Sequence, residues 1–167
     1  MRILGLPGRQ PSTFQPMRDL LALVARAGDR VEVQRYGFWA GDFTNPDLEP
    51  EALRAARSGG DLVIGWSIGA LVAMTAREQH ALEAKAWVFI GAPLKRLAAE
   101  GRSDLLRPQA ACERTLFIQQ SADPTGTFEE LTAVLPPAAE RREVAGGDHA
   151  YADAPKLAAL ITGWLPR

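Results

Sequence analysis

Three polar residues that are far apart in this chain have the side chains needed for nucleophilic catalysis: Ser67, Asp123 and His149. A serine hydroxyl is a poor nucleophile at neutral pH, so a nearby imidazole must take its proton during attack. A carboxylate then stabilises the imidazolium and holds its ring in the useful tautomer. Fixed N–H donors must also stabilise the oxyanion that forms on the attacked acyl group. These residue types predict acyl transfer through an acyl-enzyme.

Ser67 is the best-defined of the three because it lies in a Gly65-x-Ser67-x-Gly69 pattern between two predicted elements. Residues 61–64 form a short, β-branched apolar run that is typical of a buried strand. Residues at helical spacing follow the serine: Ile68, Leu71, Val72 and Thr75. Bulky residues beside so sharp a turn would collide with the adjoining strand and helix, which glycine avoids. We therefore expect Ser67 in strained backbone at the positive end of a helix.

The rest of the chain predicts strands that alternate with helices. Besides 61–64, strands are expected at residues 2–6, 31–36, 86–90, 115–119 and 141–145. Helices are expected from a Ser12 cap to near Gly28, and at 48–57, 68–79, 94–99, 128–135 and 156–164. The alternation indicates a parallel sheet with helices on both faces and an edge strand at 31–36. The three polar residues each follow a strand, so they are expected to meet at one edge of this sheet.

The composition indicates an ordinary globular protein with a single domain over residues 1–167. Hydrophobic residues make up 47% of the chain and charged residues 23%, which is close to the usual balance. The net charge of -1 argues against a general nucleic-acid binder, which needs a basic excess. No run approaches the roughly 18 apolar residues of a membrane span. We expect no nucleic-acid partner and no membrane partner.

Neither a cofactor nor a metal is expected from the sequence. No cluster of His, Cys and carboxylates has metal-ligand spacing, and no glycine-rich phosphate loop is present. The single cysteine, Cys112, cannot form an internal disulfide, which fits a reducing compartment and favours a cytoplasmic protein. Cys112 itself is interpreted as a small apolar residue that is buried or half-buried.

The motifs together resemble those of the α/β-hydrolase family, here in a small form without a lid domain. The resemblance covers nearly the whole chain and rests on three segments: Gly65-Trp66-Ser67-Ile68-Gly69, Ser121-Ala122-Asp123-Pro124 and Gly146-Gly147-Asp148-His149-Ala150. It implies that Ser67 is the nucleophile, His149 the general base and acid, and Asp123 the orienting carboxylate. It also implies a three-layer α/β/α sandwich with strand order 2-1-3-4-5-6, without the family's two leading antiparallel strands. The segment 93–114 lies where many relatives insert a lid domain. It is short in this chain, so an open site is expected.

The resemblance also implies an oxyanion hole and a set of substrate contacts. The N–H groups of Ile68 and Arg9 are the expected donors, with Pro7 standing where many relatives have histidine. Pro7 itself has no N–H. The expected substrate contacts are Trp66, Gly8, Trp39 and Tyr151. Trp66 could instead pack on a neighbouring helix, Trp39 and Phe43 could simply pack in their loop, and Tyr151 could lie behind the site.

Each candidate also has a plainer structural interpretation. Ser67 could be a small residue in a tight turn, His149 a surface histidine and Asp123 an Asp-Pro turn former. Asp148 and Asp153 compete with Asp123 for the carboxylate role, although Asp148 adjoins His149 in sequence and cannot easily reach behind its ring. His80, at the far end of the helix after Ser67, is interpreted as structural.

The sequence thus predicts a serine hydrolase that cleaves an ester or thioester with a small to medium acyl group, with activity that rises as His149 loses its proton. The alternatives are a non-catalytic binding module on the same fold, or a serine peptidase or acyltransferase. The acyl group, the leaving group and the oligomeric state stay open at this point.

Overall fold

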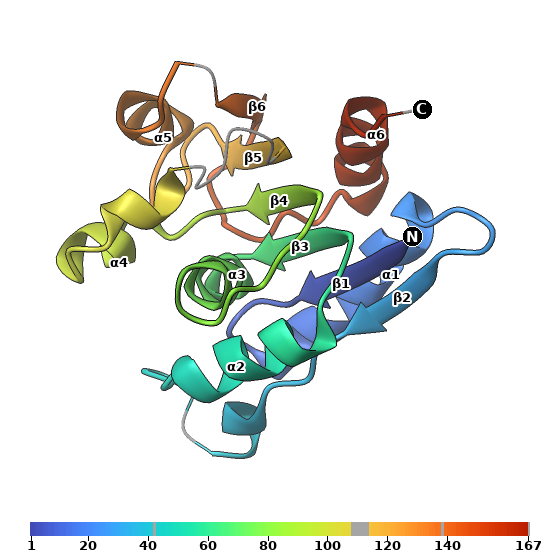
Figure 1. Cartoon of the computed structure of the whole chain (residues 1–167). Helices are drawn as coiled ribbons and strands as arrows, with labels where there is room; N and C mark the ends of the chain where they lie inside the picture. Colours follow the sequence, from blue (N-terminus) through green and yellow to red (C-terminus); the bar gives the residue numbers. More distant parts are fainter. Residues whose placement is uncertain (42, 108–113, 138, 167) are drawn as a thin grey trace.

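The computed structural model contains a six-stranded sheet in which each strand runs parallel to its neighbours (Figure 1). It describes residues 1–41, 43–107, 114–137 and 139–166. The strand order is β2-β1-β3-β4-β5-β6, which confirms the predicted order. The strands are β1 (Arg2–Leu6), β2 (Arg30–Val33), β3 (Leu62–Trp66), β4 (Ala86–Ile90), β5 (Arg114–Gln120) and β6 (Glu140–Val144).

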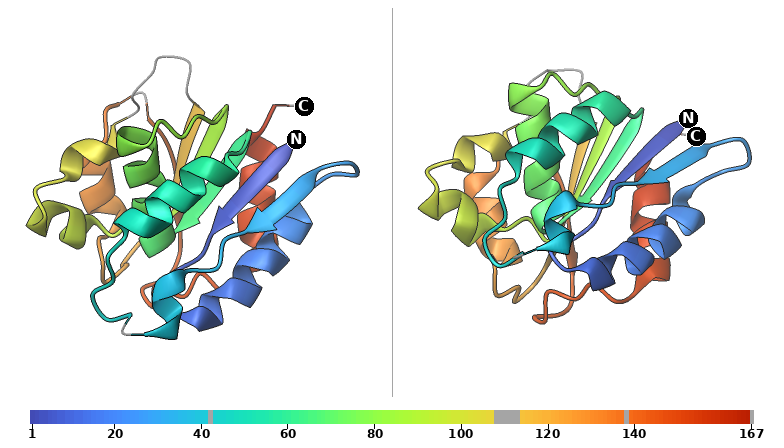
Figure 2. Two further views of the ribbon diagram at one scale, coloured as in Figure 1. Left: turned by 60° about the horizontal axis from the view of Figure 1, so that its bottom comes forward. Right: turned by 90° about the horizontal axis from the view of Figure 1, so that it is seen from below.

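Helices cover both faces of the sheet, as the three-layer prediction requires (Figure 2). The helices are α1 (Phe14–Val24), α2 (Glu49–Ser58), α3 (Ile68–Gln79), α4 (Leu94–Ala99), α5 (Phe128–Val134) and α6 (Ala154–Trp164). One apolar core lies between the sheet and α1 and α6. A second core joins the opposite face to α2, α3, α4 and α5. The strands β3 and β4 are buried along their whole length because both faces of the sheet are covered.

The first helix departs from its prediction at both ends. Ser12 does not cap it, because Pro11–Thr13 form a 3₁₀ turn, η1, that runs directly into α1. The N–H of Phe14 bonds to the carbonyl of Pro11, so the turn supplies an acceptor at the helix start. The helix ends at Val24 rather than near Gly28, because Ala25 already has extended backbone. The predicted apolar face nevertheless faces the core, with Met17, Leu20, Leu21 and Val24 buried.

The edge strand β2 ends at Val33, three residues earlier than predicted. Its next residue, Gln34, still pairs with β1 through a 3.0 Å bond from its N–H to the Gly5 carbonyl. The Gln34 side chain then donates to the carboxylate and the carbonyl of Glu51 on α2, each at 3.0 Å. Because of these bonds, the chain leaves the sheet after Gln34 and runs toward α2. The loop that follows contains η2 (Gly37–Ala40) and lies beside the end of β1.

The register of the sheet brings the carboxyl ends of the central strands together. Trp66 at the end of β3 pairs with Ile90 of β4, and Ile90 pairs with Ile118 of β5. Gln120 of β5 pairs with Val144 of β6. The loops after β1, β3, β4, β5 and β6 therefore start from one edge of the sheet, which is where parallel sheets bind ligands.

The predicted helix at 94–99 is present as α4 and is followed by the 3₁₀ turn η3 (Ser103–Leu106). The Arg77 guanidinium of α3 donates to the carbonyl of Leu105 at 2.7 Å, which ties this segment to the helix after Ser67. Cys112 lies outside the described residues, and so does part of the segment where a lid was considered. Within the described ranges, no helix has both the length and the apolar character needed to cross a membrane.

Candidate active site

The turn between β3 and α3 has the strained backbone that the glycine pattern predicts. Ser67 has φ 54° and ψ -116°, a region that residues with a side chain rarely adopt. A Cβ at Gly65 would lie 2.7 Å from the backbone of Ala70, and one at Gly69 would overlap the Leu6 carbonyl oxygen. The sheet, the loop after β1 and α3 therefore pack closely enough that only glycine fits on both sides of Ser67.

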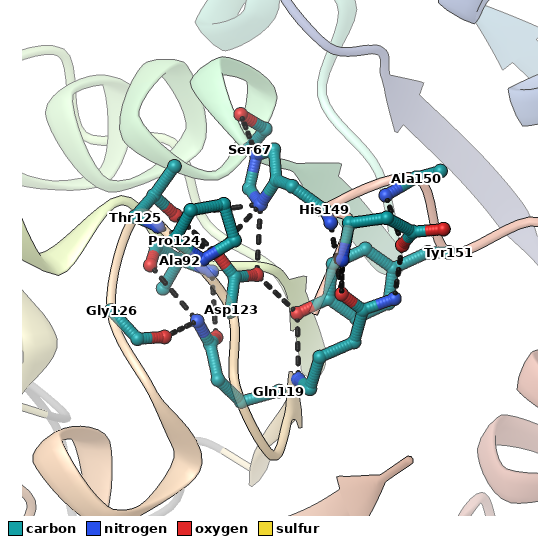
Figure 3. A network of polar contacts seen from close by, with 12 residues as sticks. Ser67, Ala92, Gln119, Asp123, Pro124, Thr125, Gly126, His149, Ala150 and Tyr151 are labelled. Atoms are coloured by element: carbon teal, nitrogen blue, oxygen red, sulfur yellow. Dashed lines mark hydrogen bonds and ion pairs between the residues drawn. The ribbon is translucent and has the colours of Figure 1, made fainter. Parts of the chain in front are cut away.

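The structure brings Ser67, His149 and Asp123 into one hydrogen-bonded chain (Figure 3). The Nε2 of His149 lies 2.8 Å from the Oγ of Ser67. The Nδ1 of the same ring lies 2.8 Å from Oδ2 and 3.0 Å from Oδ1 of Asp123. An ionised carboxylate only accepts, so Nδ1 carries the proton and the Nε2 of the neutral ring is an acceptor for the serine hydroxyl. This arrangement can remove the proton of Ser67 during an attack.

The Asp123 carboxylate is completely buried and receives several donors besides His149. The N–H and the hydroxyl of Thr125 both donate to its Oδ1 at 2.8 Å, and the Tyr151 hydroxyl donates to Oδ2 at 2.8 Å. Burial raises the pKa of this carboxyl, but hydrogen bonds from His149, Thr125 and Tyr151 outweigh burial, so the pKa lies below its usual value of 3.8. The group is therefore ionised at neutral pH, although it is buried.

The two interpretations of Asp123 are compatible. Its bond to the Thr125 N–H, two residues along the chain, is the contact of an Asx turn, so Asp123 does form the predicted Asp-Pro turn. Its other oxygen, Oδ2, faces His149 and Tyr151. The turn thus fixes the carboxylate, and a fixed carboxylate can orient the imidazole.

The rival carboxylates lie elsewhere. Asp148 accepts from the side chain of Gln120 at 2.8 Å and from the N–H of Ala150 at 2.9 Å. Asp153 accepts from the N–H of Lys156 at 3.0 Å and caps α6. The backbone bonds are local to the loop and helix that follow β6, and the Gln120 bond ties Asp148 to the end of β5. His80, at the end of α3, contacts Glu49 at 2.7 Å, in keeping with a structural role.

Two glutamines at the end of β5 hold the surrounding loops, and sequence reasoning did not select them. The Gln120 side chain accepts the N–H groups of Asp148 and His149 at 3.1 and 2.9 Å. Gln119 is fully buried; its side chain accepts from the N–H of Ala92 at 2.9 Å and donates to the carbonyl of Gly126 at 2.5 Å. The sequence signal for them was the pair of glutamines at the end of a buried apolar strand. A buried side-chain amide must be hydrogen-bonded, so this pair indicates contacts to the neighbouring loops.

Side-chain donors contact four consecutive carbonyls in the loop after β1. The Tyr36 hydroxyl donates to the carbonyl of Pro7 at 2.9 Å. The Trp39 indole donates to that of Arg9 at 2.8 Å. The single proton of the Thr13 hydroxyl is shared between the carbonyls of Gly8 at 3.1 Å and Gln10 at 2.6 Å. Because the C=O and N–H of a trans peptide point in opposite directions, the contact between Thr13 and the Gly8 carbonyl contributes to the orientation of the Arg9 N–H.

A cavity of about 670 Å³ opens beside Ser67. Its walls come from the loop after β1, the β3–α3 turn, the start of α4 and the loops after β5 and β6. The predicted residues Gly8, Arg9, Trp66 and Ile68 all line it. Among the described residues, no protein group accepts from the backbone N–H of Ile68 or Arg9. Both N–H groups are therefore available to a ligand in this cavity.

Two predicted substrate contacts lie outside the lining of this cavity. Tyr151 is only 5% exposed because its hydroxyl lies between Asp123 and the N–H of Gln120. Trp39 contacts the rings of Phe14, Tyr36 and Phe38 and reaches the site only through the Arg9 carbonyl. Trp66 combines both interpretations, since it lines the cavity and also belongs to the core between the sheet and helices α1 and α6. Its ring packs edge-on against Tyr151 in the loop before α6.

Within the part of the chain that the structure describes, no group of His, Cys, Asp and Glu residues is arranged to hold a metal ion. A scan of protein-family models gives no match to this chain. A search of curated proteins likewise gives no match. The function must therefore be argued from the site itself.

Proposed function

We propose that this protein is a serine hydrolase of the α/β-hydrolase family that cleaves an ester or thioester with a small to medium acyl group. The observation that carries the proposal is the chain of 2.8 Å contacts from Ser67 through His149 to the buried Asp123. The strained turn at Ser67 adds support, because this turn type presents a nucleophile above the sheet. A hydroxyl already in contact with its base also argues against a non-catalytic binding module.

In the acylation step, Ser67 Oγ attacks the substrate carbonyl carbon while His149 Nε2 takes its proton. The new imidazolium is stabilised by the ionised Asp123 carboxylate. The tetrahedral intermediate then expels the alcohol or thiol, which receives the proton from His149. In the second step a water molecule gives a proton to His149 as it attacks the carbonyl of the acyl-enzyme. The second tetrahedral intermediate then expels Ser67 Oγ, which takes that proton back from His149, and the acid is released.

The oxyanion of each intermediate is proposed to bind the N–H groups of Ile68 and Arg9. Both residues line the cavity beside Ser67. The carbonyl bonds from Thr13, Tyr36 and Trp39 hold the Arg9 peptide in place before substrate arrives. Such preorganisation is what makes an oxyanion hole effective, since no energy is spent on reorientation during the reaction.

The cavity volume favours a substrate of modest size. A space of about 670 Å³ is in the usual range for small-molecule sites. The single cysteine is typical of a protein from a reducing compartment, so we propose that the hydrolase acts in the cytoplasm.

The direct test is labelling with a fluorophosphonate, which reacts with activated serines. The wild-type protein should be labelled and should hydrolyse p-nitrophenyl esters. Ser67→Ala should lose the label and reduce kcat by at least about a thousandfold. Circular dichroism of both proteins controls for folding. Equal labelling of Ser67→Ala, or no labelling of the folded wild type, rules out the proposal.

A further inference from the structure

The charges that line the cavity beside Ser67 are predominantly positive. Arg9, Lys95 and Arg96 belong to its walls, whereas Asp148 is the only carboxylate among the described lining residues. Arg9 comes from the loop after β1, and the other two cations come from α4. Cations from two separate segments of the fold therefore border one cavity.

Two of these cations lack a carboxylate partner within the part of the chain that the structure describes. The Arg9 guanidinium donates to the carbonyl of Thr44 at 3.1 Å, and the Lys95 ammonium donates to that of Pro124 at 2.8 Å. Among the described residues, no carboxylate forms an ion pair with Arg9 or Lys95. Arg96 differs, because Glu100 pairs with it at 2.6 Å. An ammonium has three donors and a guanidinium five, so both unpaired cations keep donors for a ligand.

Asp148, the carboxylate among the described lining residues, is held by donors from its own loop and from the end of β5. Asp148 Oδ1 accepts from the Gln120 side chain at 2.8 Å and from the Ala150 N–H at 2.9 Å. These neutral donors orient Asp148 but leave the charges of Arg9 and Lys95 uncompensated. The cavity thus favours an anion over a neutral or cationic group.

We propose that the substrate of this site is an ester or thioester that carries a second, anionic group, such as a carboxylate or phosphate, bound by Lys95 and the Arg9 side chain. This inference rests on the proposed hydrolase function and narrows its substrate class. The anion could belong to the acyl part or to the leaving group. The chemistry of recognition is the same in both cases, and the experiment separates them.

The test compares kcat/KM for matched pairs of substrates. For an acyl-side anion, mono-p-nitrophenyl glutarate is compared with p-nitrophenyl pentanoate. For a leaving-group anion, the butyryl thioester of 3-mercaptopropionate is compared with that of 3-mercaptopropionamide. We expect the anionic member of one pair to be preferred by roughly tenfold at low salt, with the preference falling as ionic strength rises.

Variants of Lys95 test whether its positive charge causes the preference for the anionic substrate. Lys95→Met should reduce it by about two- to fivefold, whereas Lys95→Arg, which keeps the charge, should retain most of it. Lys85→Met is the matched control, since Lys85 lies before β4 at the opposite end of the sheet and pairs with Asp61. It should leave the preference unchanged.

The outcomes distinguish the two proposals. If no ester is cleaved and Ser67 takes no label, the hydrolase function itself is wrong. If both members of each pair are cleaved equally well and Lys95→Met changes neither ratio, the protein is a hydrolase but the anionic substrate class is wrong.

Discussion

The Tyr151 hydroxyl donates to Oδ2 of Asp123 at 2.8 Å, on the same oxygen that faces His149. The hydroxyl also accepts the N–H of Gln120 at 2.8 Å. Burial, together with the neighbouring carboxylate, raises the pKa of Tyr151, so it stays protonated and remains a donor. Tyr151 thus joins the end of β5 to the carboxylate, and we assign it a positioning role behind the site.

Tyr151→Phe should lower kcat by several-fold while KM changes little, because the Asp123 carboxylate loses one donor but keeps its contact with His149. The unfolding free energy should fall by about 1–2 kcal/mol, since the Gln120 N–H loses its acceptor. Loss of a bond to the charged form also raises the pKa of Asp123. The loss of stability that follows protonation of Asp123 should therefore begin at a higher pH than in the wild type. An unmoved acid stability profile with normal stability at neutral pH would contradict this role.

The crowding around the Ser67 turn predicts a strong effect of one methyl group. Gly69→Ala should lower the unfolding free energy by about 3 kcal/mol, because the new Cβ overlaps the backbone of Leu6 and the rigid sheet cannot move aside. Gly163→Ala is the matched control, since a Cβ there meets nothing within 4 Å. That change in α6 should stabilise the protein by about 0.5–1 kcal/mol. Urea denaturation of both variants checks the difference.

The bond from Thr13 to the Gly8 carbonyl predicts a catalytic effect at a residue of the cavity wall that is not one of the three hydrogen-bonded residues Ser67, His149 and Asp123. Thr13→Val preserves shape but removes the donor that the Gly8 and Gln10 carbonyls share, so the peptides on both sides of Arg9 lose part of their support. We expect kcat to fall roughly tenfold with KM nearly unchanged. Thr115→Val provides the control, because the buried Thr115 hydroxyl has no hydrogen-bond partner among the described residues, so its removal should leave kcat unchanged. Equal kinetics for the two variants would argue against Arg9 as an oxyanion donor.

The lowered pKa of Asp123 predicts a defined loss of stability in acid. A carboxyl whose folded pKa lies below its unfolded value contributes stability that is fully present above that unfolded value of about 3.9. This contribution is lost as the pH falls through the lower, folded pKa. Denaturant titrations between about pH 5 and pH 2 should show a steeper fall for the wild type than for Asp123→Asn, which cannot ionise there. Parallel curves would show that Asp123 is not selectively stabilised in its ionised form.

Much of the fold followed from patterns that are local in sequence. Buried apolar runs alternate with helical periodicity, and this alternation suffices for a parallel sheet with two helical layers. The boundaries that were wrong, at Ser12 and at the end of β2, depend on competing bonds. The η1 turn replaced a side-chain cap, and the contact between Gln34 and Glu51 drew the chain off the sheet.

The sequence by itself determined the turn at Ser67, because two glycines around a small polar residue between a strand and a helix permit few other conformations. It also determined that Ser67, Asp123 and His149 follow strands that end at one edge. Only the tertiary structure decided which groups surround them. Tyr151 became a donor behind Asp123 rather than a substrate contact, Trp39 became a support for Arg9, and Lys95 became a cavity wall. The physical reason is that backbone preferences are local, whereas hydrogen bonds and charges depend on loops that meet only when the sheet has formed.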